Sequence, residues 1–194
     1  MCYNDKEIKK PVSKRENACG KGKGMKSKQV GFDAKELENA HVNAIGNIDL
    51  LQEAKIAFLS SSIADEWVDW SAIEWVRSLK KNACVMSGFQ SRTERAVLDE
   101  LLKTERKAVM VLARKPFKRC PTKYKEAVES GKMLIIAPLD HCEGVTTKEN
   151  ALRRNEFLLR YAKTITIGFV KPNGMLDSLV KAQMKPVEVL MKQI

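Results

Sequence analysis

The sequence has few of the residues that build disulfide or metal frameworks. Its five cysteines are an odd number at irregular spacing, no two form a CxxC pair, and the chain has only two histidines. Disulfide scaffolds and structural zinc sites need regular sets of these residues, so we expect neither. Long apolar runs are also missing, since none approaches the roughly 18 residues that cross a bilayer. The N-terminal sequence MCYNDKEIKK has no apolar stretch behind its charges, so we expect no secretory signal, no membrane partner and a cytoplasmic location.

The fingerprints of common nucleotide-binding loops are absent as well. Neither GxGxxG nor GxxxxGK followed by Ser or Thr occurs, which argues against a dehydrogenase or a nucleoside triphosphatase. Catalytic side chains are scarce. His141 and Cys142 are adjacent in sequence and badly placed to act on each other, and Asp140 and Glu143 are expected to be solvated in a polar loop. We expect no catalysis, no cofactor and no metal.

Short apolar runs alternate with segments of helical periodicity. The runs lie at 55–62, 83–88, 108–114, 133–138 and 164–170, with a further candidate at 186–191, and the helical segments lie at 64–81, 91–104, 122–131, 146–162 and 174–183. Continuous apolar runs are typical of strands buried on both faces, and their alternation with helices indicates βαβ units. We predict an α/β fold, a Rossmann-like, doubly wound, mainly parallel sheet of five or six strands with helices on both faces.

Positive charge is abundant, with 35 Lys and Arg against 24 Asp and Glu and a formal net charge of +11. This excess favours a polyanionic partner, nucleic acid above all. Residues 1–30 carry nine basic and three acidic side chains in a segment too polar to fold. We predict three parts, which are a basic disordered tail at 1–30, a helical N-terminal extension at 31–53 interrupted by Gly46, and the Rossmann-like domain at 54–194.

Local signals refine the helices. Ser91 with Glu94, and Thr146 with Glu149, have the spacing of helix capping boxes, and Gly131 has the place of a helix C-terminal glycine. The segment 64–81 has a stripe of apolar residues at helical spacing, which are Trp67, Trp70, Ile73 and Val76. We expect this stripe to face the core and not to form a platform on which bases stack.

Ligands of open α/β sheets bind beyond the carboxyl ends of the strands. The residues after the predicted strands are mostly small, hydroxylic or basic, at 60–62, 87–91, 114–115, 138–144 and 171–174. The second of these loops runs directly into a capped helix, whose N-terminus offers unpaired N–H groups to an anion. A phosphate bound between Gly88 and Ser91 and an ordinary tight turn with an N-cap serine both fit the sequence.

Three stretches follow one another in a familiar order. An SG…GID…AH…AL segment is similar to the first stretch, VMSGFQSRTERAVLDELL. A strand, a YP helix and a GxLISExP strand are similar to the second, VMVLARKPFKRCPTKYKEAVESGKMLIIAP. An FPxRNRxIAxLS…VxV…SGSL segment is similar to the third, NALRRNEFLLRYAKTITIGFVKPNGML. Together, over residues 54–191, they resemble the bacterial DNA-processing family DprA, also called Smf, whose Rossmann-like domain belongs to the SLOG superfamily.

The resemblance implies a non-catalytic homodimer that binds single-stranded DNA through its phosphates during DNA uptake and recombination, with a recombinase as a candidate partner. Ser87 and Gly88 match the family's SG, Arg154 and Asn155 match the first two letters of RNR, and residues 173–176 stand at SGSL. Glu156 departs from the third letter of RNR, and the Arg of GSR and the Gly and Asp of GID are missing. An alternative therefore stays open, in which a SLOG-type domain binds or hydrolyses a small nucleotide-derived ligand.

We expect Arg154 to meet the anion and Asn155 to fix its helix against the ligand loops. Arg154→Ala should then weaken binding with little loss of stability, whereas Asn155→Leu should weaken both. The basic tail should add salt-sensitive affinity. The predicted nucleic-acid or phosphate contacts are Ser60, Ser61, Ser87, Gly88, Gln90, Ser91, Arg92, Arg114, Lys115, Arg153, Arg154, Asn155, Asn173 and Gly174.

Overall fold

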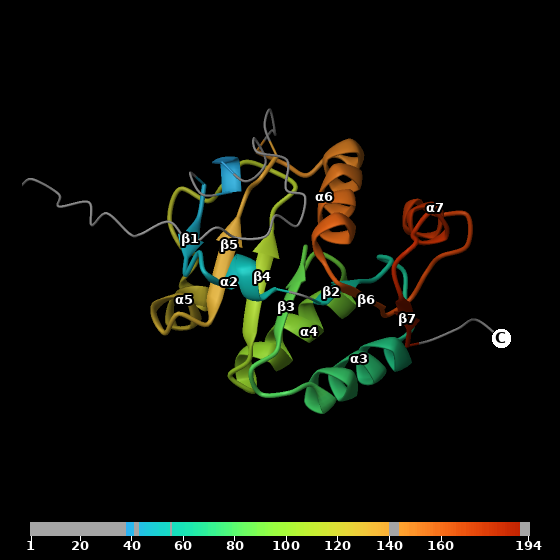
Figure 1. Cartoon of the computed structure of the whole chain (residues 1–194), viewed down its shortest axis with the longest axis horizontal. Helices are drawn as coiled ribbons and strands as arrows, with labels where there is room; N and C mark the ends of the chain where they lie inside the picture. Colours follow the sequence, from blue (N-terminus) through green and yellow to red (C-terminus); the bar gives the residue numbers. More distant parts are fainter. Residues whose placement is uncertain (1–37, 41–42, 55, 140–143, 191–194) are drawn as a thin grey trace, which may run out of the picture.

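Seven strands form one sheet in the order β1-β5-β4-β3-β2-β6-β7 (Figure 1). The computed structural model describes residues 38–40, 43–54, 56–139 and 144–190, so the predicted tail at 1–30 lies outside the described residues. All neighbouring strands run parallel except β1, which pairs with β5 antiparallel. The strands are β1 (Ile45–Gly46), β2 (Ile56–Leu59), β3 (Cys84–Ser87), β4 (Lys107–Val111), β5 (Met133–Ile136), β6 (Thr164–Ile167) and β7 (Val187–Val189).

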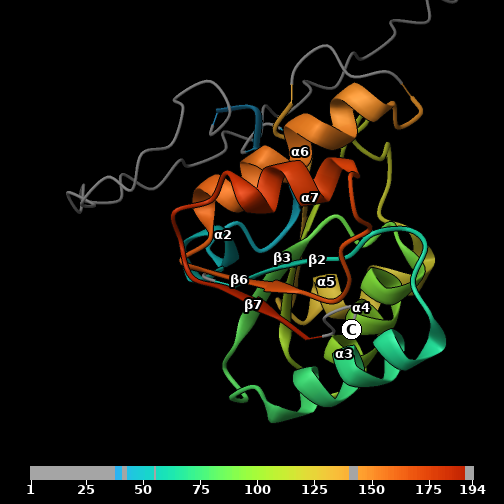
Figure 2. The same cartoon turned by 90° about the vertical axis from the view of Figure 1, so that its right-hand side faces the viewer.

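Helices cover both faces of this sheet (Figure 2), as parallel strands that are apolar on both sides require. All residues of β3 and β5 are buried. One face packs against α2 (Leu50–Glu53), α6 (Lys148–Tyr161) and α7 (Met175–Lys181). The other packs against α3 (Glu66–Ser78), α4 (Arg92–Lys103), the 3-10 turn η1 (Thr122–Tyr124) and α5 (Lys125–Glu129). The predicted Rossmann-like class is confirmed, with one strand more than expected.

The order of the strands changes direction at β2. From β2 the chain adds β3, β4 and β5 toward one edge and then returns to place β6 on the other side of β2. The loops that follow β2 and β6 are joined by hydrogen bonds from the Ser61 amide to the Phe169 carbonyl, 2.9 Å, and from the Lys171 amide to Ser61 Oγ, 2.9 Å. A switch point of this kind opens a crevice at the carboxyl ends of the strands.

The strand β1 lies within the segment 31–53, where the sequence predicted only helix. Gly46 has a φ of 110°, and a Cβ there would collide with the carbonyl group of Met133 in β5, so glycine permits both the conformation and the close approach. Leu50 and Leu51 of α2 are buried in the core that α6 shares. A strand of two residues is too short to show a period in the sequence.

The predicted core stripe of α3 is wrong for its two tryptophans, because Trp67 and Trp70 are 75% and 64% exposed. A spacing of three residues turns a helix by about 300°, so a stripe repeated three times drifts by roughly half a turn. Val76 at its end is accordingly buried while Trp67 at its start is not. The core face instead carries Trp75, whose ring lies 5.1 Å from that of Phe58.

The predicted capping box of α4 is confirmed, and Gly131 closes α5 with a φ of 72°. The box predicted for α6 is wrong by one residue. Its N-cap is Thr147, whose side chain accepts from the Asn150 amide at 3.1 Å. Thr146 is left outside the helix, where its Oγ1 accepts from Gln90 Nε2 at 3.2 Å.

Candidate phosphate-binding site

A cavity of about 530 Å³ lies at the switch point, beyond the ends of β2 and β3 and between α6 and α7. The sheet forms its floor, since parallel strands end together at one edge. Its lining residues come from the end of β2, the loops after β2, β3, β5 and β6, the first turn of α4, and the helices α6 and α7. They are Leu59, Ser60, Ser61, Ser62, Ile63, Gln90, Ser91, Glu94, Thr146, Thr147, Lys148, Ala151, Arg154, Asn155, Lys171, Met175 and Leu176.

Arg154 is the buried cation of this cavity, with only 5% of its surface exposed. Its Nε donates to Asn155 Oδ1 at 2.8 Å, whereas its buried Nη1 has no acceptor among the described residues. The guanidinium packs where a Cβ on Gly88 would be, so an alanine there would displace it. Burial lowers the pKa of Arg154, and the charge of Glu94 opposes this shift. The arginine is thus held in place with an unsatisfied donor.

Ser60 provides a second unsatisfied group in the same cavity. It directly follows β2, is 7% exposed, and its buried Oγ has no hydrogen-bond partner in the described part of the chain. A Cβ on Gly168, at the end of β6, would lie 3.1 Å from this oxygen. Buried polar groups normally have partners, so two residues with unpartnered groups lining one cavity make it a candidate site for a polar ligand.

Glu94 occupies the backbone amides that the sequence offered to a phosphate. Its Oε2 accepts from the amides of Gln90 and Ser91 at 2.8 and 3.3 Å, and its Oε1 accepts from the amide of Ser60 at 3.1 Å. The Glu94 amide in turn donates to Ser91 Oγ at 3.1 Å. At Ser60, Gln90 and Ser91, the side chains and not the backbone amides are therefore available to donate hydrogen bonds to a ligand in the cavity.

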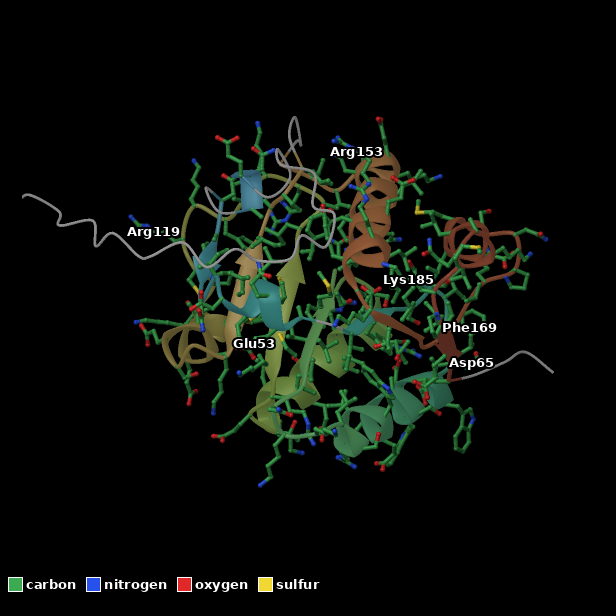
Figure 3. The ribbon with its side chains drawn as sticks, in the orientation of Figure 1. Glu53, Asp65, Arg119, Arg153, Phe169 and Lys185 are labelled. Atoms are coloured by element: carbon green, nitrogen blue, oxygen red, sulfur yellow. The ribbon has the colours of Figure 1, made fainter. Side chains whose placement is uncertain are left out.

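The helix α6, which carries Arg154, is fixed at its C-terminal end by Lys185 (Figure 3). The Nζ of Lys185 donates to the carbonyls of Leu159, Arg160 and Ala162 at 2.7, 2.6 and 2.9 Å. The last carbonyls of a helix have no partners within the helix, and a cation placed there also complements the helix dipole. This anchor sets the orientation of α6 over the strand ends.

The structure brings six of the predicted contacts together in the cavity. Two others, Ser87 and Gly88, lie behind it. Ser87 is fully buried and its Oγ accepts from the Phe89 amide at 3.3 Å, and buried Gly88 is the surface against which Arg154 packs. The six cavity residues are Ser60, Ser61, Gln90, Ser91, Arg154 and Asn155.

The other predicted cations do not line the cavity. Arg92 pairs with Asp69 at 2.7 Å, which ties α4 to α3. Arg114 lies over the ring of Phe117, with 4.3 Å between the guanidinium and the ring centroid, and exposed Lys115 follows it in the loop after β4. This loop lies two strand positions from β2 along the same edge of the sheet.

The remaining predicted contacts lie around the ends of α6 and α7. Arg153 is half-buried on α6, and Figure 3 shows it near the upper end of that helix. Arg119 lies far from it, at the left of the molecule in the same view. Gly174 is the N-cap of α7. Asn173 has a φ of 58°, and its amide donates to Asp177 Oδ2 at 2.9 Å.

Several cavity residues are absent from the predicted contacts, among them Glu94, Thr147, Lys148 and Lys171. Lys171 directly follows the fifth apolar run, which was a usable signal. Lys148 begins α6, where nothing in the sequence shows that the helix start approaches the loop after β3. The ionisable side chains of the lining are one carboxylate and three cations, Glu94 against Lys148, Arg154 and Lys171, a formal excess of +2.

No protein-family model and no curated protein matches the sequence. Among solved structures, DNA processing protein A from Streptococcus pneumoniae is similar with a TM-score of 0.63 and 16% sequence identity, over 78% of this chain and 55% of that protein. DNA processing protein A from Helicobacter pylori, described with a single-stranded DNA binding mode, is similar with a TM-score of 0.59 and 20% identity, over 78% of this chain and 72% of that one. The chain has the fold of DNA processing protein A.

The expected resemblance to DprA is therefore confirmed at the level of the fold. This chain spans about 55% of the length of the S. pneumoniae protein. Within the described ranges, no helix is long and apolar enough to cross a membrane, and no cluster of three His, Cys, Asp or Glu side chains is arranged to hold a metal ion.

Proposed function

We propose that this chain is a DprA-like protein that binds single-stranded DNA through its phosphates, with the cavity at the ends of β2, β3 and β6 as the primary site. The observation that carries the proposal is the buried Arg154 cation, whose Nη1 has no acceptor among the residues that the structure describes, in a cavity that also holds the Ser60 hydroxyl, unpartnered among the same residues. Both atoms are fully covered in this structure, with Nη1 packed on Gly88, so the proposal includes a rotation of the two side chains toward a phosphate in the cavity. Charge-assisted bonds of the kind they would then make are about twice as strong as neutral ones.

Neighbouring cations extend this site along the sheet edge. Lys148 and Lys171 line the cavity, and Arg114 and Lys115 follow β4, whose axis lies roughly 10 Å from that of β2. Single-stranded DNA that leaves the cavity past Gln90 would reach Arg114 and Lys115 within a few nucleotides. The homodimer, the recombinase partner, the role in DNA uptake and recombination, and the cytoplasmic location all belong to this proposal.

The proposal includes no catalysis. Among the described residues, the cavity lining has one carboxylate, Glu94, and both of its oxygens are bonded to backbone amides. A general base needs a free oxygen within reach of the proton that it removes. The chain accordingly holds its ligand and does not cleave it.

Fluorescence anisotropy with a labelled single-stranded oligonucleotide at several salt concentrations tests the proposal. Phosphate contacts from Lys148, Arg154 and Lys171 would give log K a slope of about −2 against log salt. Loss of residues 1–30, predicted to add non-specific affinity, should make the slope shallower and leave binding at low salt intact. No binding at low salt, or an affinity that ignores salt, would contradict the proposal.

A small nucleotide-derived ligand is the second candidate, and the cavity volume favours it. About 530 Å³ lies within the range of small-molecule sites, and α7 contributes Met175 and Leu176 to the wall. A thermal-shift screen of nucleotides distinguishes the two functions. A rise in Tm with a mononucleotide that survives removal of residues 1–30, together with no oligonucleotide binding, would favour the small ligand.

A further inference from the structure

We propose that the cavity takes a phosphate monoester, the group that a terminally phosphorylated strand or a mononucleotide carries, in preference to the phosphodiesters within a strand. This inference rests on the proposed function and narrows its ligand. Three features of the cavity carry it, which are its closed floor, its charge and its apolar rim.

The floor is closed by the sheet itself. Arg154 and Ser60 are both more than nine-tenths buried, the guanidinium packs on Gly88 at the end of β3, and Ser60 Oγ packs beside Gly168 at the end of β6. A group that reaches both polar atoms has therefore come to the edge of the strands and can go no further. The rest of the ligand must therefore extend back out through the opening of the cavity.

This geometry favours a chain end. A phosphodiester within a strand is flanked by two nucleosides, and both would have to share the cavity of about 530 Å³. A terminal monoester is attached to one nucleoside only, so one sugar and one base occupy the space above the floor. That volume suits a single ligand of nucleotide size.

The charge of the cavity also matches a monoester. Lys148, Arg154 and Lys171 against Glu94 leave a formal excess of +2. A phosphate monoester carries about −1.5 to −2 at pH 7, whereas a phosphodiester carries a single negative charge. Because the amides of Ser60, Gln90 and Ser91 already serve Glu94, the ligand's charge has to be met by these side chains.

Apolar side chains stand at the rim above this polar floor. Ile63 and Met175 both line the cavity and are 70% and 37% exposed, and exposed Val145 precedes the lining residue Thr146. Exposed apolar side chains beside a cluster of Lys and Arg side chains suit a ligand in which a negatively charged group is joined to an aromatic ring. A nucleoside on a terminal phosphate has this composition.

The test compares the full chain's affinity for oligonucleotides of one sequence that differ only at the end. A 3′-labelled 12-mer is used with a 5′-phosphate or a 5′-hydroxyl, a 5′-labelled 12-mer with a 3′-phosphate or a 3′-hydroxyl, and a nucleoside monophosphate competes in a separate arm. We expect about tenfold tighter binding for a phosphorylated end. Arg154→Met and Ser60→Ala should each shrink this difference, whereas the matched control Arg106→Met should keep it.

The outcomes separate this inference from the proposed function. Equal, tight binding of all four oligonucleotides overturns the monoester preference and leaves DNA binding in place. Binding of the nucleoside monophosphate alone keeps the monoester preference and overturns DNA binding. If nothing binds, both fail. A phosphate-dependent gain that persists in both Arg154→Met and Ser60→Ala also overturns the inference, because the monoester would then lie elsewhere.

Discussion

Two arginines are buried in the part of the chain that the structure describes, and each has a nitrogen with no hydrogen-bond partner there, but their roles differ. Arg106 donates through Nη2 to the carbonyls of Arg77 and Leu79, so it ties the end of α3 to the start of β4. Within the described ranges, Arg154 has only the side chain of Asn155 as its acceptor, and it lines a cavity. The backbone contacts make Arg106 structural, whereas the free donor of Arg154 suits a ligand.

Arg154→Met should weaken phosphate binding while the free energy of unfolding stays the same or rises by about 1 kcal/mol, because a buried charge with few partners costs more in desolvation than it gains. Urea denaturation and anisotropy measure the two effects. Arg106→Met should do the reverse and lose about 1–3 kcal/mol, since it leaves buried carbonyls unpaired. A large loss of stability in Arg154→Met would show that the arginine holds the fold together.

Gly88→Ala tests the packing of the guanidinium. Gly88 does not have a positive φ, so alanine is permitted by the backbone and the conflict falls on Arg154. We expect binding to fall by about tenfold with a stability change below about 2 kcal/mol. The double variant Gly88→Ala/Arg154→Met should bind no more weakly than Arg154→Met alone, because both changes remove one interaction. Additive losses would mean that Gly88 contacts the ligand by itself.

Part of the site could be predicted from the sequence at this scale. Ser60, Ser61 and Arg154 were found because they follow a strand or match a motif, and the strand ends of such a sheet meet at one edge. The second role of Glu94 could not be predicted. Its capping bond is local, but its bond to the Ser60 amide joins residues 34 apart in sequence, which only the folded chain brings together.

Among the elements, α3 presents two tryptophans to solvent and one to the core. Trp67→Ser and Trp70→Ser should each change the free energy of unfolding by less than about 0.5 kcal/mol, whereas Trp75→Ala should lower it by about 3–5 kcal/mol. Chemical denaturation of the three variants checks this. A loss above 1 kcal/mol in either serine variant would mean that the exposed indoles are covered in solution.

The helix α7 is stabilised by a carboxylate that should make it sensitive to acid. Bonds from Lys181 Nζ and the Asn173 amide lower the pKa of Asp177. A lowered folded-state pKa adds stability above the unfolded value of about 3.9, and this contribution is lost as pH falls through the folded value. The stability difference between wild type and Asp177→Asn should therefore be constant near pH 7 and vanish at strongly acidic pH. A difference independent of pH would contradict this assignment.

The sequence predicted most helices and strands, but not which face of every helix is buried or at which residue every helix begins. Five continuous apolar runs became strands because burial on both faces leaves no polar alternation, which is a strong signal. The sixth candidate became β7, whose central Glu188 is exposed. The helical stripe through Trp67 failed because a spacing of three drifts around the helix. The α6 cap moved from Thr146 to Thr147 because two adjacent threonines offer the same side chain, and only packing chooses between them.

Across the whole molecule, the strand order determines where the ligand site lies. Because β6 returns to the side of β2 opposite β3, three strand ends and two helices surround one point of the edge. Residues that are far apart in sequence, such as Ser60 and Arg154, thereby meet in one cavity. The site is therefore a property of the topology and does not depend on a continuous motif.

The antiparallel strand β1 has a consequence for the order of folding. Ile45 pairs with Ile135 across 90 residues, so this contact closes a long loop and gives only a short ladder in return. The pairs β2–β3, β3–β4 and β4–β5 join strands that are much nearer in sequence. The pair β2–β6 closes a loop of 108 residues, but it forms a ladder of four residue pairs, whereas β1–β5 forms two. We expect β1 to dock after the rate-limiting step.

In stopped-flow kinetics, Ile45→Ala should therefore speed unfolding and leave the folding rate unchanged, whereas Val109→Ala in the central strand β4 should slow folding as well. A slower folding rate in Ile45→Ala would place β1 in the nucleus. On the expected result, the first strand of the sheet in sequence joins it only after the rate-limiting step.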